Sequence, residues 1–317
     1  MQNDCPKLIL APMAGYTDYP FRRLAREFGA DEVVTELVSA NAIVRNNRKT
    51  LKMLGLHDDE RPASIQIFGS DPAVMAEAAK IVETFDPLFI DLNMGCPVRK
   101  VVRNGAGSAL LTNKETAEKI MKDVVGAVKT PVSVKIRTGK NHADKTGFDV
   151  ALLAADCGVR RVTVHARTVA DGFTGPVDYD FVALLKKRVD VEVIGNGGIT
   201  SVEKAREWMD RTGCDGLMVG RGAVGRPSIF RAIRENKDYL PKEESVMVLR
   251  HIDLVEEFAG PGGLGPMRGH LVHYSKGFEK ARSFRQEVVS ARSFEELRAV
   301  VVEYMNDSVE VVNDRAV

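Results

Sequence analysis

Residues 191–222 read VEVIGNGGITSVEKAREWMDRTGCDGLMVGRG, and this stretch contains one complete β/α unit. The apolar runs Val191–Gly195 and Gly216–Val219 predict buried parallel strands, because they lack the polar alternation of a half-exposed strand. Between them, Val202–Arg211 has the spacing of a helix, and Ser201 predicts its N-cap. Each strand leads directly into a glycine-rich turn.

The same alternation of short apolar runs and helical patterns is repeated along most of the chain. The expected strands are Leu8–Ala11, Glu32–Leu37, Ala63–Phe68, Leu88–Leu92, Val132–Ile136, Arg161–His165, Val191–Gly195 and Gly216–Val219. The expected helices are Tyr19–Phe28, Ala73–Thr84, Lys114–Val128 (N-cap Asn113), Gly147–Asp156, Asp180–Lys187 and Val202–Arg211. Between the second and third strands the pattern is irregular, and no helix is assigned there.

Eight β/α units over about 230 residues match the size of a TIM (β/α)8 barrel. A doubly wound sheet is the alternative, but it would need fewer strands and a dinucleotide-binding GxGxxG after the first one. The first strand leads instead into Met13-Ala14-Gly15-Tyr16. We therefore expect the α/β class and a barrel.

The alternation of strand and helix patterns ends after residue 240. No strand-like run follows, and the remaining chain reads as several helices broken at Gly260-Pro261-Gly262-Gly263 and at Gly265-Pro266. The sequence thus predicts a (β/α)8 barrel over residues 1–240 and a C-terminal all-helical domain over residues 241–317.

Composition excludes several classes of protein. The chain has 317 residues with 45 Lys and Arg against 44 Asp and Glu, so its net charge of +1 excludes a polybasic tail binder. Its four cysteines form no CxxC pair, which argues against a structural zinc site. The start lacks a signal-peptide pattern, and no apolar run approaches the roughly 18 residues of a membrane span. We expect a cytoplasmic protein with reduced thiols.

In a TIM barrel the functional residues lie at the carboxyl ends of the strands. Glycine-rich turns after the last two strands, at Gly197-Gly198 and Gly220, offer backbone N–H groups and helix N-termini to an anion. Arg221 adds a guanidinium suited to phosphate. Either turn alone fits a tight connection equally well, but together they favour a phosphate-bearing cofactor.

Other strand ends carry single residues that can be interpreted in two ways. Lys135 interrupts an apolar strand, so it either faces outward or points inward toward an anionic or electron-rich ligand. Cys96, held in a turn, is a candidate acid or nucleophile, although the usual state of cysteine is a buried, inert thiol. His165 is either a core histidine or a donor to a ligand. Arg137 and Arg167 can hydrogen-bond a polar, planar ligand.

Several motifs in these positions resemble those of the tRNA-dihydrouridine synthases. In chain order they are APMAGYTD (11–18), QIFG (66–69), DLNMGCPVRKV (91–101), GAGSAL (105–110), VKIR (134–137), HART (165–168), NGGI (196–199) and GRGAVGRP (220–227). The likeness covers nearly the whole barrel and continues more weakly into the C-terminal helices.

The resemblance implies an FMN enzyme that uses NADPH, or NADH, to reduce the C5–C6 double bond of particular uridines in tRNA. It implies hydride transfer from reduced flavin to C6, a proton from Cys96 to C5, and a uracil positioned by Asn93 and Arg137. The residues it implies for FMN binding are Pro12, Met13, Ala14, Gln66, Lys135, His165, Asn196, Gly197, Gly198, Gly220 and Arg221. We also expect no metal, no membrane contact and no obligate protein partner.

Two positions depart from the family pattern. Gly198 stands where many members carry an acidic residue, so any role of a carboxylate there is lost. Phe173 stands where a tyrosine is often found, so stacking can persist but a hydroxyl contact cannot.

The charges are not evenly distributed, so the near-zero net charge of the whole chain does not exclude binding of nucleic acid. Between Arg268 and Arg292 six cations stand against two acids, a local net of +4, and the candidate RNA contacts are Arg282 and Arg285. Rings at His270, His273, Tyr274 and Phe278 lie among them, a mixture that suits RNA. Two further basic runs are Arg45, Arg48, Lys49, Lys52 and Arg99, Lys100, Arg103. Each run also fits an ordinary solvated helix face.

Two other functions compete with this interpretation. A dihydroorotate or dihydropyrimidine dehydrogenase is also an FMN barrel with a cysteine acid/base, but it would not need a basic helical extension. A flavin-binding regulatory protein would keep the fold and the flavin without turnover.

Overall fold

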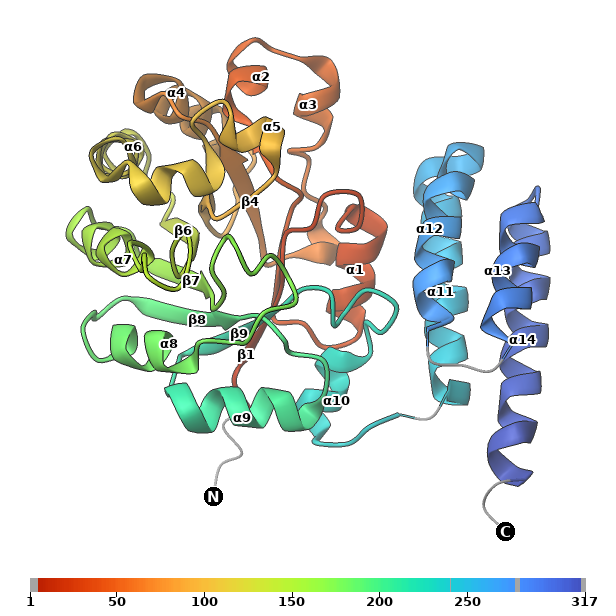
Figure 1. Ribbon diagram of the computed structural model, residues 1–317. Helices are drawn as coiled ribbons and strands as arrows, with labels where there is room; N and C mark the ends of the chain where they lie inside the picture. The colour runs from red at the N-terminus through yellow and green to blue at the C-terminus, as the bar shows by residue number, and fades with distance from the viewer. Residues whose placement is uncertain (1–4, 240, 277–279, 315–317) are drawn as a thin grey trace.

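Nine parallel strands form one sheet that closes into a barrel within residues 5–239, 241–276 and 280–314, the parts of the chain that this computed structural model describes (Figure 1). The strands are β1 Lys7–Leu10, β2 Glu32–Val34, β3 Val38–Ser39, β4 Ala63–Phe68, β5 Ile90–Met94, β6 Val132–Arg137, β7 Arg161–His165, β8 Glu192–Asn196 and β9 Gly216–Val219. Their order is β2-β1-β9-β8-β7-β6-β5-β4-β3, and pairing of β2 with β4 closes the ring. The predicted TIM barrel is confirmed.

The second expected strand, Glu32–Leu37, is wrong in its extent. The ladder pairs Val34 with Ser64 and then Val38 with Ile67, so one extra residue is accommodated between β2 and β3. The Thr35 hydroxyl accepts the Gln66 N–H at 3.2 Å and replaces a ladder carbonyl. This bulge ends β2 early and leaves β3 as a separate two-residue strand.

Helices surround the barrel on its outside (Figure 1). They are α1 Tyr19–Glu27, α4 Pro72–Glu83, α6 Lys114–Ala127, α7 Gly147–Asp156, α8 Tyr179–Lys186, α9 Val202–Thr212 and α10 Ile229–Glu235. The expected N-caps form, because Asn113 accepts from Thr116 N and Ser201 from Lys204 N, each at 3.2 Å. The irregular stretch before β4 contains two short helices, α2 Ala40–Val44 and α3 Arg48–Lys52, and α5 Arg99–Val102 follows β5.

The C-terminal helices stand along one flank of the barrel, beside α1 (Figure 1). They are α11 Pro241–Ala259, α12 Leu264–Tyr274, α13 Ala281–Ser290 and α14 Phe294–Asp314. Phe21 of α1 stacks on His270 of α12, with ring centroids 5.1 Å apart, and Arg250 of α11 pairs with Glu27. None of the helices, within the residues described, is long and apolar enough to cross a membrane.

The pleat of the strands sorts side chains between the barrel interior and the helices. On β1, Leu8 and Leu10 join the outer core beneath the helices, whereas Ile9 faces a small inner cluster. That inner cluster consists of Ile9, Ala11, Val34, Ile194 and Met218, all buried. On β6 the polar Ser133, Lys135 and Arg137 alternate with the apolar Val132, Val134 and Ile136.

The amino-terminal end of the barrel is closed by buried ion pairs. Arg161 of β7 spans the interior to Glu32 of β2, donating through Nη1 at 2.5 Å and Nη2 at 2.9 Å. Its Nε donates to Glu192 at 2.5 Å, and Glu192 also accepts from Lys7 at 2.6 Å. These four strand-start residues neutralise one another beneath the apolar inner cluster.

Replacing Arg161 by methionine should lower the free energy of unfolding by about 3 kcal/mol, because the buried Glu32 would lose its guanidinium partner and keep only Lys7, which is partly exposed and 3.4 Å away. Urea unfolding measures this difference. Arg160→Met is the matched control, since Arg160 is exposed beside it, and it should change stability by less than about 0.5 kcal/mol. Equal stabilities for both variants would contradict the assigned ion pairs.

Candidate active site

Two connected hollows occupy the carboxyl-terminal mouth of the barrel. The first, the Cys96 compartment, has a volume of about 420 Å³. The second, the Gly197 compartment, has a volume of about 370 Å³. They share the lining residues Pro12, Met13, Lys135, His165, Phe173, Arg221 and Lys276. The two hollows are therefore parts of one elongated cavity.

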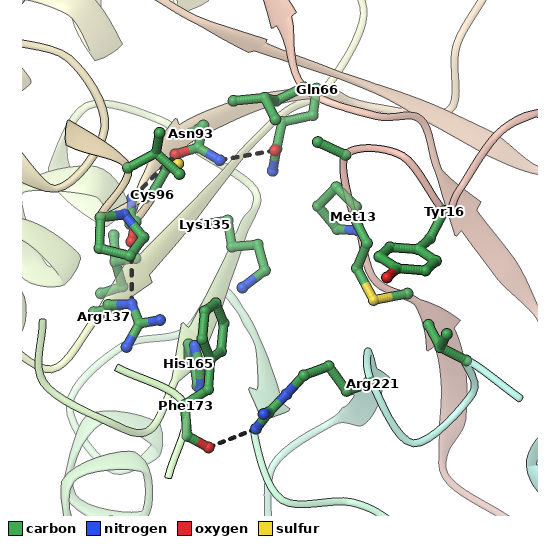
Figure 2. A pocket seen from close by; sticks show the side chains of 18 of the residues that line it. Met13, Tyr16, Gln66, Asn93, Cys96, Lys135, Arg137, His165, Phe173 and Arg221 are labelled. Carbon is green, nitrogen blue, oxygen red and sulfur yellow. Dashed lines mark hydrogen bonds between the residues drawn. The ribbon is translucent and has the colours of Figure 1, made fainter. Parts of the chain in front are cut away.

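Figure 2 shows how the first compartment is built from opposite sides. Asn93 and Cys96 lie on one side of the cavity, Met13 and Tyr16 lie on the other, and Lys135 projects between them. Neighbouring strands supply the polar groups of the cavity, since Asn93 pairs with Lys135 and His165 pairs with Asn196 across the ladders.

The turn that carries Cys96 is fixed by a buried amide network. The Asn93 Oδ1 atom accepts the backbone N–H of Cys96 at 3.0 Å, and its Nδ2 donates to Gln66 Oε1 at 2.8 Å. Gln66 in turn donates to Asp91 at 2.6 Å, as does Ser133. Burial raises the pKa of Asp91, although both donors favour its charged form. The half-buried Cys96 thus sits on a rigid support at the cavity wall.

Lys135 points into the cavity (Figure 2) and does not face outward, as the alternative interpretation of its sequence position held. Its Nζ donates to Asn196 Oδ1 at 2.9 Å, and Asn196 is itself held by Met218 O at 2.6 Å. Burial, followed by the charge of Arg137, lowers the pKa of Lys135 to about 8. A buried ammonium with one amide partner is strongly disposed toward an anion.

Positive charge dominates the whole lining. The cationic residues are Lys135, Arg137, Arg167, Arg221 and Lys276, and none of the described lining residues is an aspartate or glutamate. Burial and these neighbouring charges also lower the pKa of His165, which therefore acts as a neutral hydrogen-bonding group. The cavity is electrostatically suited to an anionic ligand.

Arg137 connects the Cys96 turn with the loop that carries Phe173. Its Nε donates to Gly95 O at 3.1 Å, while Nη1 donates to Thr168 O at 2.8 Å and to Gly172 O at 2.6 Å. Burial, then Arg167, lowers its pKa to about 10. The Phe173 ring lies 5.1 Å from the Arg137 guanidinium and 4.8 Å from that of Arg221.

Gly197 and Gly198 form a bare backbone cradle in the second compartment. Their φ angles are +123° and +68°, which side-chain-bearing residues rarely adopt, and a Cβ on Gly197 would lie 2.9 Å from the His165 ring. At Gly198 a Cβ would lie 3.0 Å from Val177. A backbone without side chains that lines the same compartment as Arg167 and Arg221 suits a phosphate.

The structure brings together most of the sequence-predicted site residues. Those that line the cavity are Pro12, Met13, Ala14, Gln66, Asn93, Cys96, Lys135, Arg137, His165, Asn196, Gly197, Gly198, Gly220 and Arg221. Arg282 and Arg285 line neither compartment among the described residues. Arg282 is exposed on α13, and Arg285 donates to Ser275 Oγ at 2.9 Å. Phe278 lies outside the described residues.

Tyr16, His273 and Lys276 also line the cavity, although the sequence did not predict them for the site. Tyr16 follows β1 within the quoted APMAGYTD motif, so the strand-end rule could have identified it. His273 and Lys276 come from the end of α12, where no strand-end rule applies. The two other basic runs, on α3 and α5 with their neighbouring residues, are exposed outside the cavity.

The concentration of polar groups at the carboxyl ends of the strands makes this protein a TIM-barrel enzyme. The family model described as Dihydrouridine synthase (Dus) matches residues 9–310. The chain therefore belongs to the dihydrouridine synthase family.

Relatives and solved structures agree with this assignment. The chain is 42% identical over 290 residues to tRNA-dihydrouridine synthase B of Pseudomonas aeruginosa, covering 89% of this chain and 87% of the relative. It is 38% identical over 287 residues to a probable tRNA-dihydrouridine synthase of Rickettsia typhi, covering 88% of each. The fold is similar to that of histamine dehydrogenase from Rhizobium sp. 4-9 (TM-score 0.57, 13% identity, 78% of this chain, 49% of that one). A 2-naphthoyl-CoA reductase is likewise similar (TM-score 0.59, 11%, 73% and 50%).

Burial of the Lys135 charge should reduce the stability of the protein when no anion is bound. A pKa lowered from 10.5 to about 8 corresponds to about 3 kcal/mol at neutral pH. Lys135→Met should therefore raise the free energy of unfolding by about that amount at pH 7. The unfolded chain holds the extra proton between pH 8 and 10.5, so wild-type stability recovers there and the advantage of the variant shrinks.

Urea unfolding at pH 7 and pH 9.5 tests both the size and the direction of this effect. Lys187→Met, which removes an exposed ammonium at the opposite end of the barrel, should leave stability nearly unchanged at both values. A Lys135→Met variant less stable than wild type at pH 7 would contradict the inference.

Proposed function

We propose that this protein reduces the C5–C6 double bond of particular uridines in tRNA to dihydrouridine, with FMN as cofactor and NADPH, or NADH, as reductant. The observation that carries the proposal is the Cys96 turn facing the buried Lys135 ammonium across one cavity at the barrel mouth. Membership of the dihydrouridine synthase family and the names of the relatives support the same reaction. The four free cysteines suit the cytoplasm, which we propose as its location.

The residues of the cavity fit FMN. Its phosphate would be held by the cradle of Gly197 and Gly198, by Gly220 and by Arg221, where no side chain blocks the backbone. Its ring system would lie against Pro12, Met13, Ala14, Gln66, Lys135 and His165, with Asn196 holding Lys135 in place. When bound, FMN supplies a hydride to C6 of the uracil.

Lys135 and the neighbouring arginines would stabilise negative charge on the cofactor. This role follows from preorganisation, since Arg137 and Arg167 are buried and Lys135 is already held by Asn196 before charge develops. The neutral His165 would add a hydrogen bond without adding another cation.

Cys96 would give the proton that completes the reduction. Negative charge develops toward C5 and the C4 carbonyl of the uracil, and the thiol can protonate C5 from the side of the cavity wall. The network of Asn93 and Gln66 fixes the turn from which Cys96 projects. Among the described residues, Nη2 of Arg137 donates to no acceptor, so it is available to a uracil oxygen.

A uridine stacked in folded tRNA must be extruded to reach this cavity. We assign the barrel, residues 1–240, to catalysis and the helices of residues 241–317 to tRNA binding. The basic side chains on α13 and the exposed cations of α3 and α5 would contact phosphates, while the near-neutral total charge limits indiscriminate binding. The basic helical flank favours this function over that of a free-pyrimidine dehydrogenase or a flavin-binding regulator.

Replacing Cys96 by alanine should keep bound flavin but lower dihydrouridine formation by at least about 100-fold, because the proton donor is removed. The measurement is dihydrouridine content of unmodified tRNA after incubation with enzyme and NADPH. Cys5→Ala removes another half-buried thiol, at the opposite end of the barrel, and should retain activity. Full activity of Cys96→Ala would show that Cys96 is not the proton donor. Turnover of dihydroorotate by the wild-type protein, without activity on tRNA, would favour the dehydrogenase alternative.

Removing the charges of Arg282 and Arg285 by substitution with glutamine should weaken tRNA binding, because fewer RNA phosphates are then neutralised by the protein. The slope of log affinity against log salt should fall by about 1 for each phosphate that is no longer neutralised. Filter binding or fluorescence anisotropy between 50 and 200 mM salt, roughly the range over which such binding weakens, measures it. Arg188→Gln, an exposed arginine at the amino-terminal end of the barrel strands, is the control. An unchanged slope would exclude this patch from RNA binding.

A further inference from the structure

The end of α12 supplies part of the cavity wall. His273 lines the Cys96 compartment, and Lys276, two residues after the last residue of the helix, lines both compartments. Three described cations line both compartments, and the other two, Lys135 and Arg221, come from the barrel. The cavity is thus completed by a segment far from the barrel in sequence.

A hydrogen bond between barrel and helix holds this segment in place. The Tyr16 hydroxyl lies 2.9 Å from His273 Nε2, and the two rings meet edge to face at 5.2 Å. From the other side, Gly225 approaches so closely that a Cβ there would lie 2.5 Å from the His273 carbonyl oxygen. The end of α12 therefore packs between the loop after β1, through Tyr16, and the loop after β9, through Gly225.

Behind these contacts lies a buried cluster of rings. His270 contacts Tyr16 edge to face at 5.7 Å, stacks on Phe21 at 5.1 Å and meets His251 at 4.6 Å. Burial lowers the pKa of both histidines, that of His270 to about 4, so the cluster is neutral and packs as an apolar unit. Because Phe21 belongs to α1, this packing fixes α12 to the barrel.

Lys276 differs from the other two shared cations in its contacts. Lys135 donates to Asn196 at 2.9 Å, and Arg221 donates to Phe173 O at 2.5 Å. The Lys276 side chain is exposed to the cavity mouth and has no hydrogen-bond or ion-pair partner among the described residues. It lines the same compartment as Gly197, Gly198 and Arg221, so its ammonium group is available at the end suited to phosphate.

We propose that Lys276 is a ligand of the cofactor phosphate and that the Tyr16–His273 hydrogen bond is the element that positions it. This inference rests on the proposed FMN site and extends that site from the barrel into the C-terminal helices. A phosphate monoester carries a charge of about −1.5 to −2 at neutral pH. The cations that the barrel contributes to the Gly197 compartment are Lys135, Arg167 and Arg221. Those three already donate to protein acceptors, whereas Lys276 adds a cation with no such partner among the described residues. Docking of α12 thereby becomes linked to cofactor binding.

The test compares the affinity of the apoprotein for FMN and for riboflavin, which lacks the phosphate, by quenching of flavin fluorescence. Lys276→Met should weaken FMN binding about tenfold and leave riboflavin binding unchanged, as expected when one charge-assisted hydrogen bond to phosphate is removed. Lys276→Arg should retain most of the preference. The matched control Lys187→Met, an exposed lysine on the opposite end of the barrel, should behave as wild type.

Tyr16→Phe keeps the ring and removes only the hydroxyl. It should reduce the preference for FMN over riboflavin in the same direction, and the double variant with Lys276→Met should show no further reduction of that preference. Independent, additive reductions would show that Tyr16 does not act through Lys276 and would overturn its positioning role.

Other outcomes separate this inference from the function on which it rests. Unchanged FMN affinity in Lys276→Met, or equal weakening for FMN and riboflavin, would overturn the phosphate contact. Weaker tRNA binding with unchanged FMN affinity would assign Lys276 to the RNA and also overturn it. Failure of the wild-type protein to bind either flavin would instead refute the proposed cofactor, and with it the inference.

Discussion

Closure of the parallel strands into a ring, in which β2 and β3 together occupy one of eight places beside β4, is the constraint on which the other features of this protein depend. Because all the strands run in one direction, their carboxyl ends open on one mouth and their amino ends on one base. The pleat then assigns alternate residues to the interior. Lys135 enters the cavity for this reason, between Val134 and Ile136, which pack beneath the helices. A change of one residue in register would exchange these positions and move the ammonium group out of the cavity.

Charge is distributed along the barrel axis in two different ways. At the base, the cations Arg161 and Lys7 meet Glu32 and Glu192 and are neutralised within the protein. At the mouth, cations accumulate without lining carboxylates among the residues described. The base therefore contributes to folding on its own, whereas the mouth reduces stability until an anion is bound. Such local conflict with folding is expected where a protein binds a ligand.

The sequence allowed much of the fold to be predicted, because the barrel repeats one local unit. Strand and helix limits agree within about two residues for most elements, and both predicted N-caps form. The bulge after Val34 escaped prediction because the Thr35 hydroxyl substitutes for a backbone acceptor, which apolar periodicity does not register. The site residues at strand ends could also be predicted, because each repeated β/α unit places the end of its strand at the mouth of the barrel. His273 could not, because only tertiary packing of α12 brings it to the mouth.

The bulge between β2 and β3 has a consequence for how this cavity can vary among related chains. The extra residue turns Leu37 toward the Cys96 compartment, while Val38 packs outward into the core. The apolar side chain that lines this part of the cavity is thus determined by the number of residues in the bulge. In a regular strand it would be determined by the alternation of side chains along the strand. Insertion or deletion of one residue in this bulge would change which side chain faces the ligand. The pairing of β2 and of β3 with β4 would stay the same. Substrate preference can therefore evolve by a change in chain length at this point, independently of the residues that carry out the chemistry.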